Sequence, residues 1–178
     1  KVQSSIPQDD QKDDRRPEEI PQLPQIDINT SGWKTYRHEE YGFEIQYQPY
    51  YYATPSTYNS AWLGWKQPDL SLTLTEIEPG GGAKGAVYPN ISINVFKKLT
   101  IADVLSFLRD RYSNVTQKQV SIGKHNILLL EWSQSAEITN QSLLIDDPEF
   151  VYIINADHFN SLLTQIILNE ILLHLKLL

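Results

Sequence analysis

The sequence predicts an α+β domain, in which an antiparallel sheet of about six to seven strands carries two main packing helices. Three observations predict this class. Several short segments alternate apolar and polar side chains, which is typical of strands with one buried face. Two longer segments carry apolar residues at helical spacing. Glycine- or proline-containing turns separate the segments, as antiparallel neighbours require.

The first part of the chain differs from the rest in composition. Residues 1–32 hold seven acidic and four basic side chains, with four of the ten prolines. Prolines forbid a regular helix, and neighbouring like charges repel. So few apolar side chains cannot offset the entropy lost on ordering. We therefore predict an acidic, Pro/Gln-rich tether over residues 1–32 and one folded domain over residues 33–178.

The strand pattern begins at Trp33. We expect strands at 33–37, 41–47, 70–75, 91–95, 115–122, 127–132, 141–145 and 150–155. Between 41 and 47 the period of two places the side chains on alternate faces of the sheet. This spacing predicts one face with Tyr41, Phe43, Ile45 and Tyr47, and an opposite face with Glu44 and Gln46.

Two segments predict helices. Thr100 can cap the first, and Asp103 stands where a carboxylate reaches back to the cap amide. Its apolar residues continue at helical spacing to Tyr112. The second covers 159–178, where Phe159, Leu162, Leu163, Ile166, Ile167 and Leu173 form the expected core face. Polar residues such as Gln165 and Glu170 interrupt this segment too often for a membrane span.

The composition of the chain argues against several classes of function. The chain has no cysteine, so disulfides, thiolate nucleophiles and zinc–thiolate sites are excluded. Its net charge of -7 argues against a nucleic-acid surface, which needs clustered Lys and Arg. We expect no cofactor and no nucleic-acid partner.

The N-terminal residues bear on localisation. The chain starts at Lys1 and contains no methionine, so it is either a processed product or a trimmed chain. A polar tether after a cleaved signal is typical of exported proteins. We expect an extracytoplasmic protein, secreted or lipid-anchored at the cell surface, with membrane contact only through a removed N-terminal anchor.

The start of the domain resembles a known family. Trp33-Lys-Thr-Tyr36, followed by Tyr41-Gly-Phe43-Glu-Ile-Gln-Tyr47 and Pro49, is similar to the opening of PsbP-like domains, especially the small bacterial lipoproteins of that fold. The resemblance implies the fold and a docking role without catalysis. It departs where Gln48 separates Tyr47 from Pro49. No photosystem-docking segment is matched, so that partner is not implied.

Two clusters could bind a metal. His38-Glu39-Glu40 and Asp146-Asp147-Pro148-Glu149 bring imidazole or carboxylate groups together. Consecutive residues in a strand point to opposite faces, and calcium needs six or more oxygens, usually from a longer loop. We interpret both as solvated turns and expect no metal site. The sequence also has no Gly-x-Ser-x-Gly, phosphate-cradling or His-Glu-x-x-His motif, so we predict no catalytic residue.

The most unusual feature is an aromatic segment. Its candidate interface residues are Tyr50, Tyr51, Tyr52, Tyr58, Trp62 and Trp65. One interpretation is core packing under a long loop, and the other is an exposed patch that a partner covers. Three consecutive tyrosines cannot all face one side of a strand, so we expect at least one to be largely exposed.

These observations predict a function without catalysis. We expect an extracytoplasmic binding or assembly module, held by its N-terminal linker, that docks on a protein partner or on copies of itself. The alternative is a small-ligand carrier or hydrolase with a pocket between sheet and helix. Converging polar groups would favour the alternative, whereas a flat aromatic patch would favour the module.

Overall fold

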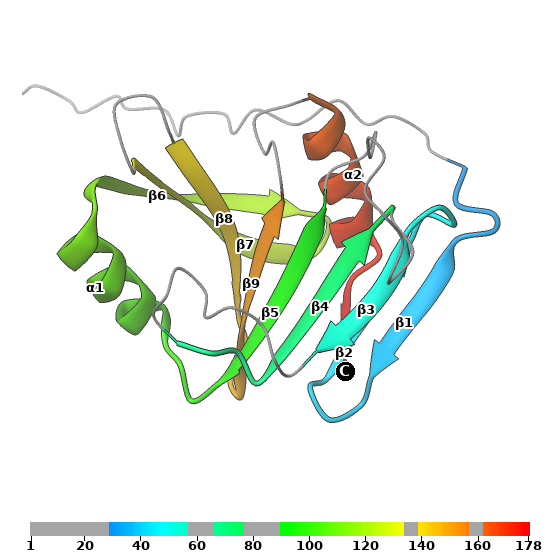
Figure 1. Cartoon of the computed structure of the whole chain (residues 1–178), viewed down its shortest axis with the longest axis horizontal. Coiled ribbons are helices and arrows are strands. Elements are labelled where there is room, and N and C mark those ends of the chain that lie inside the picture. Colours follow the sequence, from blue (N-terminus) through cyan, green and yellow to red (C-terminus); the bar gives the residue numbers. More distant parts are fainter. Residues whose placement is uncertain (1–28, 57–65, 77–89, 134–138, 157–161) are drawn as a thin grey trace, which may run out of the picture.

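The computed structural model describes residues 29–56, 66–76, 90–133, 139–156 and 162–178. They form a seven-stranded sheet, a three-stranded sheet and two helices (Figure 1). The α+β class and the two packing helices are thus confirmed. Among these residues no helix is long and apolar enough to cross a membrane.

The seven-stranded sheet is antiparallel throughout. In spatial order it contains β3 (Tyr52–Ser56), β4 (Leu70–Thr75), β5 (Ile91–Lys97), β9 (Phe150–Ala156), β8 (Thr139–Asp146), β7 (His125–Ser133) and β6 (Ser113–Ile122). Its size agrees with the predicted six to seven strands. Its membership differs, because the first two predicted strands lie elsewhere.

Those two strands form a second sheet. β1 (Lys34–His38) and β2 (Phe43–Tyr47) pair with each other, and the short β10 (Lys176–Leu177) pairs with β2 on its other side. The predicted alternation in β2 is confirmed: Phe43, Ile45 and Tyr47 are buried in the core, together with Tyr41 just before the strand.

Hydrophobic residues pack on both faces of the larger sheet. The first core lies between this sheet and a layer made of α2 (Leu162–Leu173) and the three-stranded sheet. The second core lies under α1 (Ile101–Arg111), on the opposite face. Members of the first core include Phe43, Ile45, Leu72, Leu74, Ile93, Val95, Ile154, Ile167 and Ile171. Members of the second include Phe96, Val104, Leu108, Leu130, Trp132, Leu144, Val151 and Ile153.

The predicted cap of α1 is confirmed. Asp103 donates its backbone N–H to the Thr100 hydroxyl at 3.1 Å, and the Thr100 backbone N–H donates to the Asp103 carboxylate at 2.9 Å. Each side chain satisfies a backbone donor that the first turn leaves unpaired.

The C-terminal helix is shorter than predicted. α2 ends at Leu173, the chain turns, and residues 176–177 become β10. Leu173, which we expected in the core, is 40% exposed, whereas Leu168, Leu172 and Leu175 are buried. Almost every position here is apolar, so the sequence pattern does not mark which side of the helix faces the core.

Two predicted hairpin turns are confirmed. Gly123 adopts φ 58 in the turn that pairs Ile122 with His125, a conformation that favours glycine. The turn after Asp146 joins β8 to β9 as expected. β3 was not predicted, because Pro55 interrupts its pattern; this strand lies at the sheet edge, where proline is tolerated.

Candidate functional site

One half of the larger sheet presents uncharged polar side chains on the face that carries α1. In β4, Leu72 and Leu74 belong to the first core, so Ser71, Thr73 and Thr75 point to the other side. The same alternation holds in β5, where Ser92 and Asn94 lie opposite the apolar residues.

Strand register aligns these residues across the sheet. Thr54 is opposite Thr73, Thr73 is opposite Ser92, and Ser92 is opposite Asn155. Ser142 of β8 extends the line, because its hydroxyl donates to the side-chain oxygen of Asn155. We call Thr54, Thr73, Ser92, Asn155 and Ser142 the polar row. It crosses five strands without a charged or apolar side chain.

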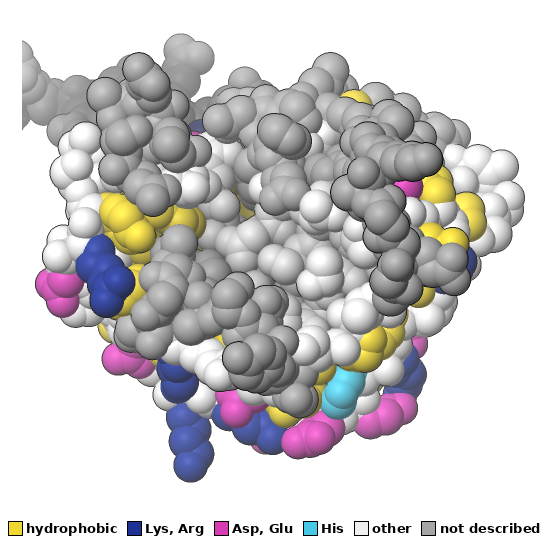
Figure 2. Space-filling view, viewed as in Figure 1, with side chains coloured by type: hydrophobic (Ala, Val, Ile, Leu, Met, Phe, Trp, Pro, Cys, Tyr) yellow, Lys and Arg dark blue, Asp and Glu magenta, His cyan; other side chains and the backbone are white. Residues whose placement is uncertain are grey.

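A shorter line of the same character lies beside the polar row. It consists of Ser56, Ser71 and Asn94, which are paired across β3, β4 and β5. Beyond Asn94 the line becomes apolar at Ile153, which belongs to the core under α1. The two lines together form what we call the polar face. In Figure 2, which views this side of the molecule, the charged side chains gather toward the rim.

Most of the polar row keeps contact with solvent. Thr54, Thr73, Ser92 and Asn155 are half-buried, whereas Ser142 is fully buried. Asn94, buried beside the row, donates from Nδ2 to the Ser92 hydroxyl at 3.4 Å. Hydroxyl and amide groups both donate and accept hydrogen bonds, so the face can satisfy a ligand that carries both kinds of group.

One residue of the aromatic segment, Tyr52, lies beside the polar face. Tyr52 is 39% exposed and lies opposite Thr75, on the same side of the sheet as the row. The Lys34 ammonium is 5.2 Å from the centre of its ring and donates to the Tyr51 carbonyl at 3.0 Å. We expected at least one of the three tyrosines to be largely exposed; Tyr52 is the exposed one, to the extent of 39%.

Of the other predicted interface residues, two are not exposed and three lie outside the described residues. Tyr51 is fully buried in the first core, and Tyr50 is half-buried against it, with ring centres 5.0 Å apart. Tyr51 therefore contributes to packing and not to a surface. Tyr58, Trp62 and Trp65 lie outside the described residues.

The two clusters considered as metal sites are turns. Glu39 pairs with Arg37 at 2.6 Å, and Glu40 pairs with Lys97 at 2.9 Å. These cations lower the pKa of each carboxyl, and they occupy groups that a metal would need. In the second turn, the Glu149 backbone N–H donates to the Asp147 side chain at 3.1 Å. The described part of the chain holds no group of three or more potential metal-ligating side chains.

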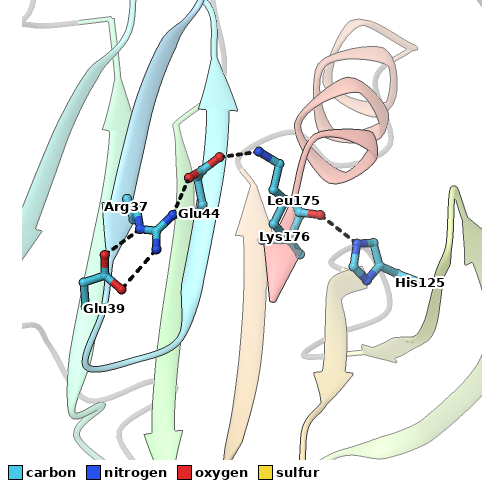
Figure 3. A network of polar contacts seen from close by, with 6 residues as sticks. All are labelled: Arg37, Glu39, Glu44, His125, Leu175 and Lys176. Atoms are coloured by element: carbon cyan, nitrogen blue, oxygen red, sulfur yellow. Dashed lines mark hydrogen bonds and ion pairs between the residues drawn. The ribbon is translucent and has the colours of Figure 1, made fainter. Parts of the chain in front are cut away.

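A polar network at the C-terminal end has a structural role (Figure 3). The Glu44 carboxylate accepts from Lys176 at 2.6 Å and from Arg37 at 3.3 Å. The hydrogen bond from Lys176 is the main cause that lowers the Glu44 pKa, and Arg37 adds to it. Buried His125 is 2.9 Å from the Leu175 carbonyl, so its Nε2–H donates there. The Glu44–Lys176 ion pair thus holds β10 on β2, and the His125 contact ties the residue before β10 to the start of β7.

Sequence reasoning missed the polar face. Its signal was present as the polar half of the alternating segments 70–75 and 91–95. The sequence does not show the order of the strands in the sheet, in which β3, β4, β5, β9 and β8 are successive neighbours. The role of His125 was also missed, because its partner carbonyl lies fifty positions further along the chain.

Comparisons with known proteins find no relative. No family model matches the chain, and neither the curated proteins nor the solved structures contain a match. The PsbP-like resemblance therefore stays a prediction.

Proposed function

We propose that this chain is a non-enzymatic binding domain that holds an uncharged ligand on the polar face. The polar row is the observation that carries the proposal. Four half-buried hydrogen-bonding side chains from four strands lie in one line across the sheet, and buried Ser142 of a fifth strand donates to the last of them, without a charge among the five. Specific sites place a small number of polar groups in this way to fix the orientation of a ligand.

The chemistry of the face favours binding over catalysis. A serine or threonine nucleophile needs an adjacent base. Neither line of the polar face contains a histidine, carboxylate or amine among its described members. The polar face therefore supports a ligand carrier, which is one of the two alternative functions that the sequence analysis kept open. Its described members supply no base for the other alternative, a hydrolase.

The location of this activity is also a proposal. We infer that binding takes place outside the cytoplasm, on a domain that residues 1–32 connect to a surface. The acidic, proline-rich composition of that segment supports this inference, because such a chain is an extended and soluble spacer.

Amide NMR of the ¹⁵N-labelled full chain tests the binding face. The probes are a panel of uncharged mono- and disaccharides and capped dipeptides, which carry hydroxyl or amide groups and no charge. We expect at least one probe to shift the signals of β4, β5 and β9 at the polar row. Thr73→Arg places a bulky cation in the middle of the row, so these shifts should disappear.

Two further variants make the test specific. Thr35→Arg, on exposed β1, adds the same charge elsewhere and should leave binding unchanged. Thr73→Val keeps the shape of the side chain but removes its hydroxyl, and should weaken binding without loss of the fold. The proposal is wrong if no probe shifts the row, or if the shifts persist in Thr73→Arg.

A further inference from the structure

The strand β6 forms the outer edge of the larger sheet, at the end where α1 lies (Figure 1). It pairs with β7 on one side and has no strand on its other side among the described residues. Seven of its ten residues are exposed. A long exposed edge presents unpaired backbone N–H and C=O groups that can pair with another chain.

The edges formed by β3 and β1 carry features that discourage pairing. β3 has five residues and contains Pro55, which cannot donate to a new neighbour. β1 also has five residues, and Lys34 and Arg37 place charges on it. β6 contains no proline and one charged residue, Lys118, and its irregularity is confined to the first residues, before Thr116.

Basic side chains outnumber acidic ones near β6, in contrast to the net charge of -7 of the chain. Glu131 of the neighbouring β7, opposite Thr116, is an acidic residue among them. Arg109 and Arg111 lie in the last turn of α1, just before the strand, and Lys124 follows it. Asp110 is the one acidic residue between positions 109 and 124. Within the described ranges, none of these three cations, nor Lys118 in the strand itself, takes part in an ion pair.

We propose that β6 binds an extended, acidic segment of a protein partner, which adds an eighth strand to the sheet. Backbone hydrogen bonds would supply affinity, as in other cases of strand addition. A carboxylate opposite Lys118 would form a favourable cross-strand pair, and the basic surroundings attract acidic segments.

The charge of Lys118 also disfavours a second copy of this chain as the partner. In an antiparallel pair of β6 strands centred on Lys118, the two Lys118 side chains would lie opposite each other. Like charges in this position destabilise the pair. An acidic segment places the opposite charge there.

A peptide probe tests this proposal on the full chain. The probe alternates glutamate and valine over seven residues, with blocked ends. We expect it to shift the amide signals of residues 116–121 and to slow hydrogen exchange of the outward-pointing amides. A second probe with the same side chains but alternate N-methyl groups cannot pair along one edge and should not bind.

A charge-reversal variant distinguishes binding at the β6 edge from general electrostatic attraction between the acidic probe and the protein. Lys118→Glu should weaken binding of the acidic probe about tenfold, because an attractive pair becomes a repulsive one. Lys98→Glu, an exposed lysine just after β5, is the matched control and should bind normally. Thermal melting checks that both variants are folded.

Several results would overturn the proposal. These are no binding of the acidic probe, signal shifts away from 116–121, equal binding of the N-methylated probe, or unchanged binding to Lys118→Glu. A dimer in sedimentation that Lys118→Glu strengthens would assign the edge to a second copy instead. None of these results bears on the polar face, which lies on other strands.

Discussion

Glu44 is a carboxylate at the centre of the three-stranded sheet, and only 8% of the residue is exposed. A buried charge is tolerated when it is paired. Here Lys176 and Arg37 approach from the two neighbouring strands, so one side chain links β1, β2 and β10. The charge of Glu44 therefore helps to keep the C-terminal residues in place.

The lowered pKa of Glu44 predicts a pH dependence. Its ionised form contributes stability above the ordinary pKa of 4.5, and this contribution is lost as the pH falls through the lower folded-state value. We expect Glu44→Gln to be less stable than the natural chain near pH 7, with a difference that shrinks in acid. Urea unfolding at several pH values measures it. Glu39→Gln, which removes an exposed carboxylate, is the control and should show a smaller difference.

Tyr51 and Tyr52 form a matched pair for a second prediction. Tyr51→Ala empties a site in the first core and should lower the free energy of unfolding by about 3 kcal/mol or more. Tyr52→Ala removes an exposed ring and should cost less than about 1 kcal/mol. Denaturant unfolding of both variants provides the comparison. Equal losses would mean that Tyr52 is also part of the core.

At the scale of the element, helix α1 depends on both its ends and its buried side. Val104, Phe107 and Leu108 are buried against the larger sheet. The capping box at Thr100 satisfies the first turn, and Arg109 and Arg111 lie near the negative end of the helix dipole. These local features agree with the packing, so this helix was predicted closely.

Removal of the cap should have a measurable cost. Thr100→Ala deprives the Asp103 N–H of its acceptor, and we expect a loss of about 1 kcal/mol in the free energy of unfolding. Ser106→Ala, at an exposed position inside the same helix, should change stability little or raise it slightly. If both variants lose the same amount, the cap does not stabilise the helix.

On the scale of the whole molecule, one sheet separates two cores. The first core packs between the larger sheet and the layer of α2 and the smaller sheet, and the second lies under α1. All residues named in both cores lie after Asn29. Both cores, as described, are thus built from residues of the domain itself.

Deletion of residues 1–28 should leave the domain folded. We expect a cooperative thermal transition whose midpoint stays within about 2 °C of that of the full chain, because the deletion removes none of the core residues that the structure describes. Differential scanning calorimetry of both chains is the measurement. A broad transition or a large fall in midpoint would show that the N-terminal segment completes a core.

The sequence by itself determined the local features of this protein. Alternation located eight of the ten strands, helical spacing located both helices, and Thr100 with Asp103 marked the start of α1. Each of these signals depends on residues a few positions apart, where backbone geometry fixes which side chains share a face. The same local rule predicted that three consecutive tyrosines cannot all face one side of a strand.

Only the tertiary structure decided which strands become neighbours. β1 and β2 do not join the larger sheet; they pair with each other, and β2 also pairs with β10. Leu173, which was expected in the core, is exposed, whereas Leu172 and Leu175 are buried. The polar row joins residues from Thr54 to Asn155. Alternation places all of them except Thr54 on strands, but it does not place them side by side. Strand pairing depends on contacts between distant segments, and the period of a single strand carries no information about its neighbour.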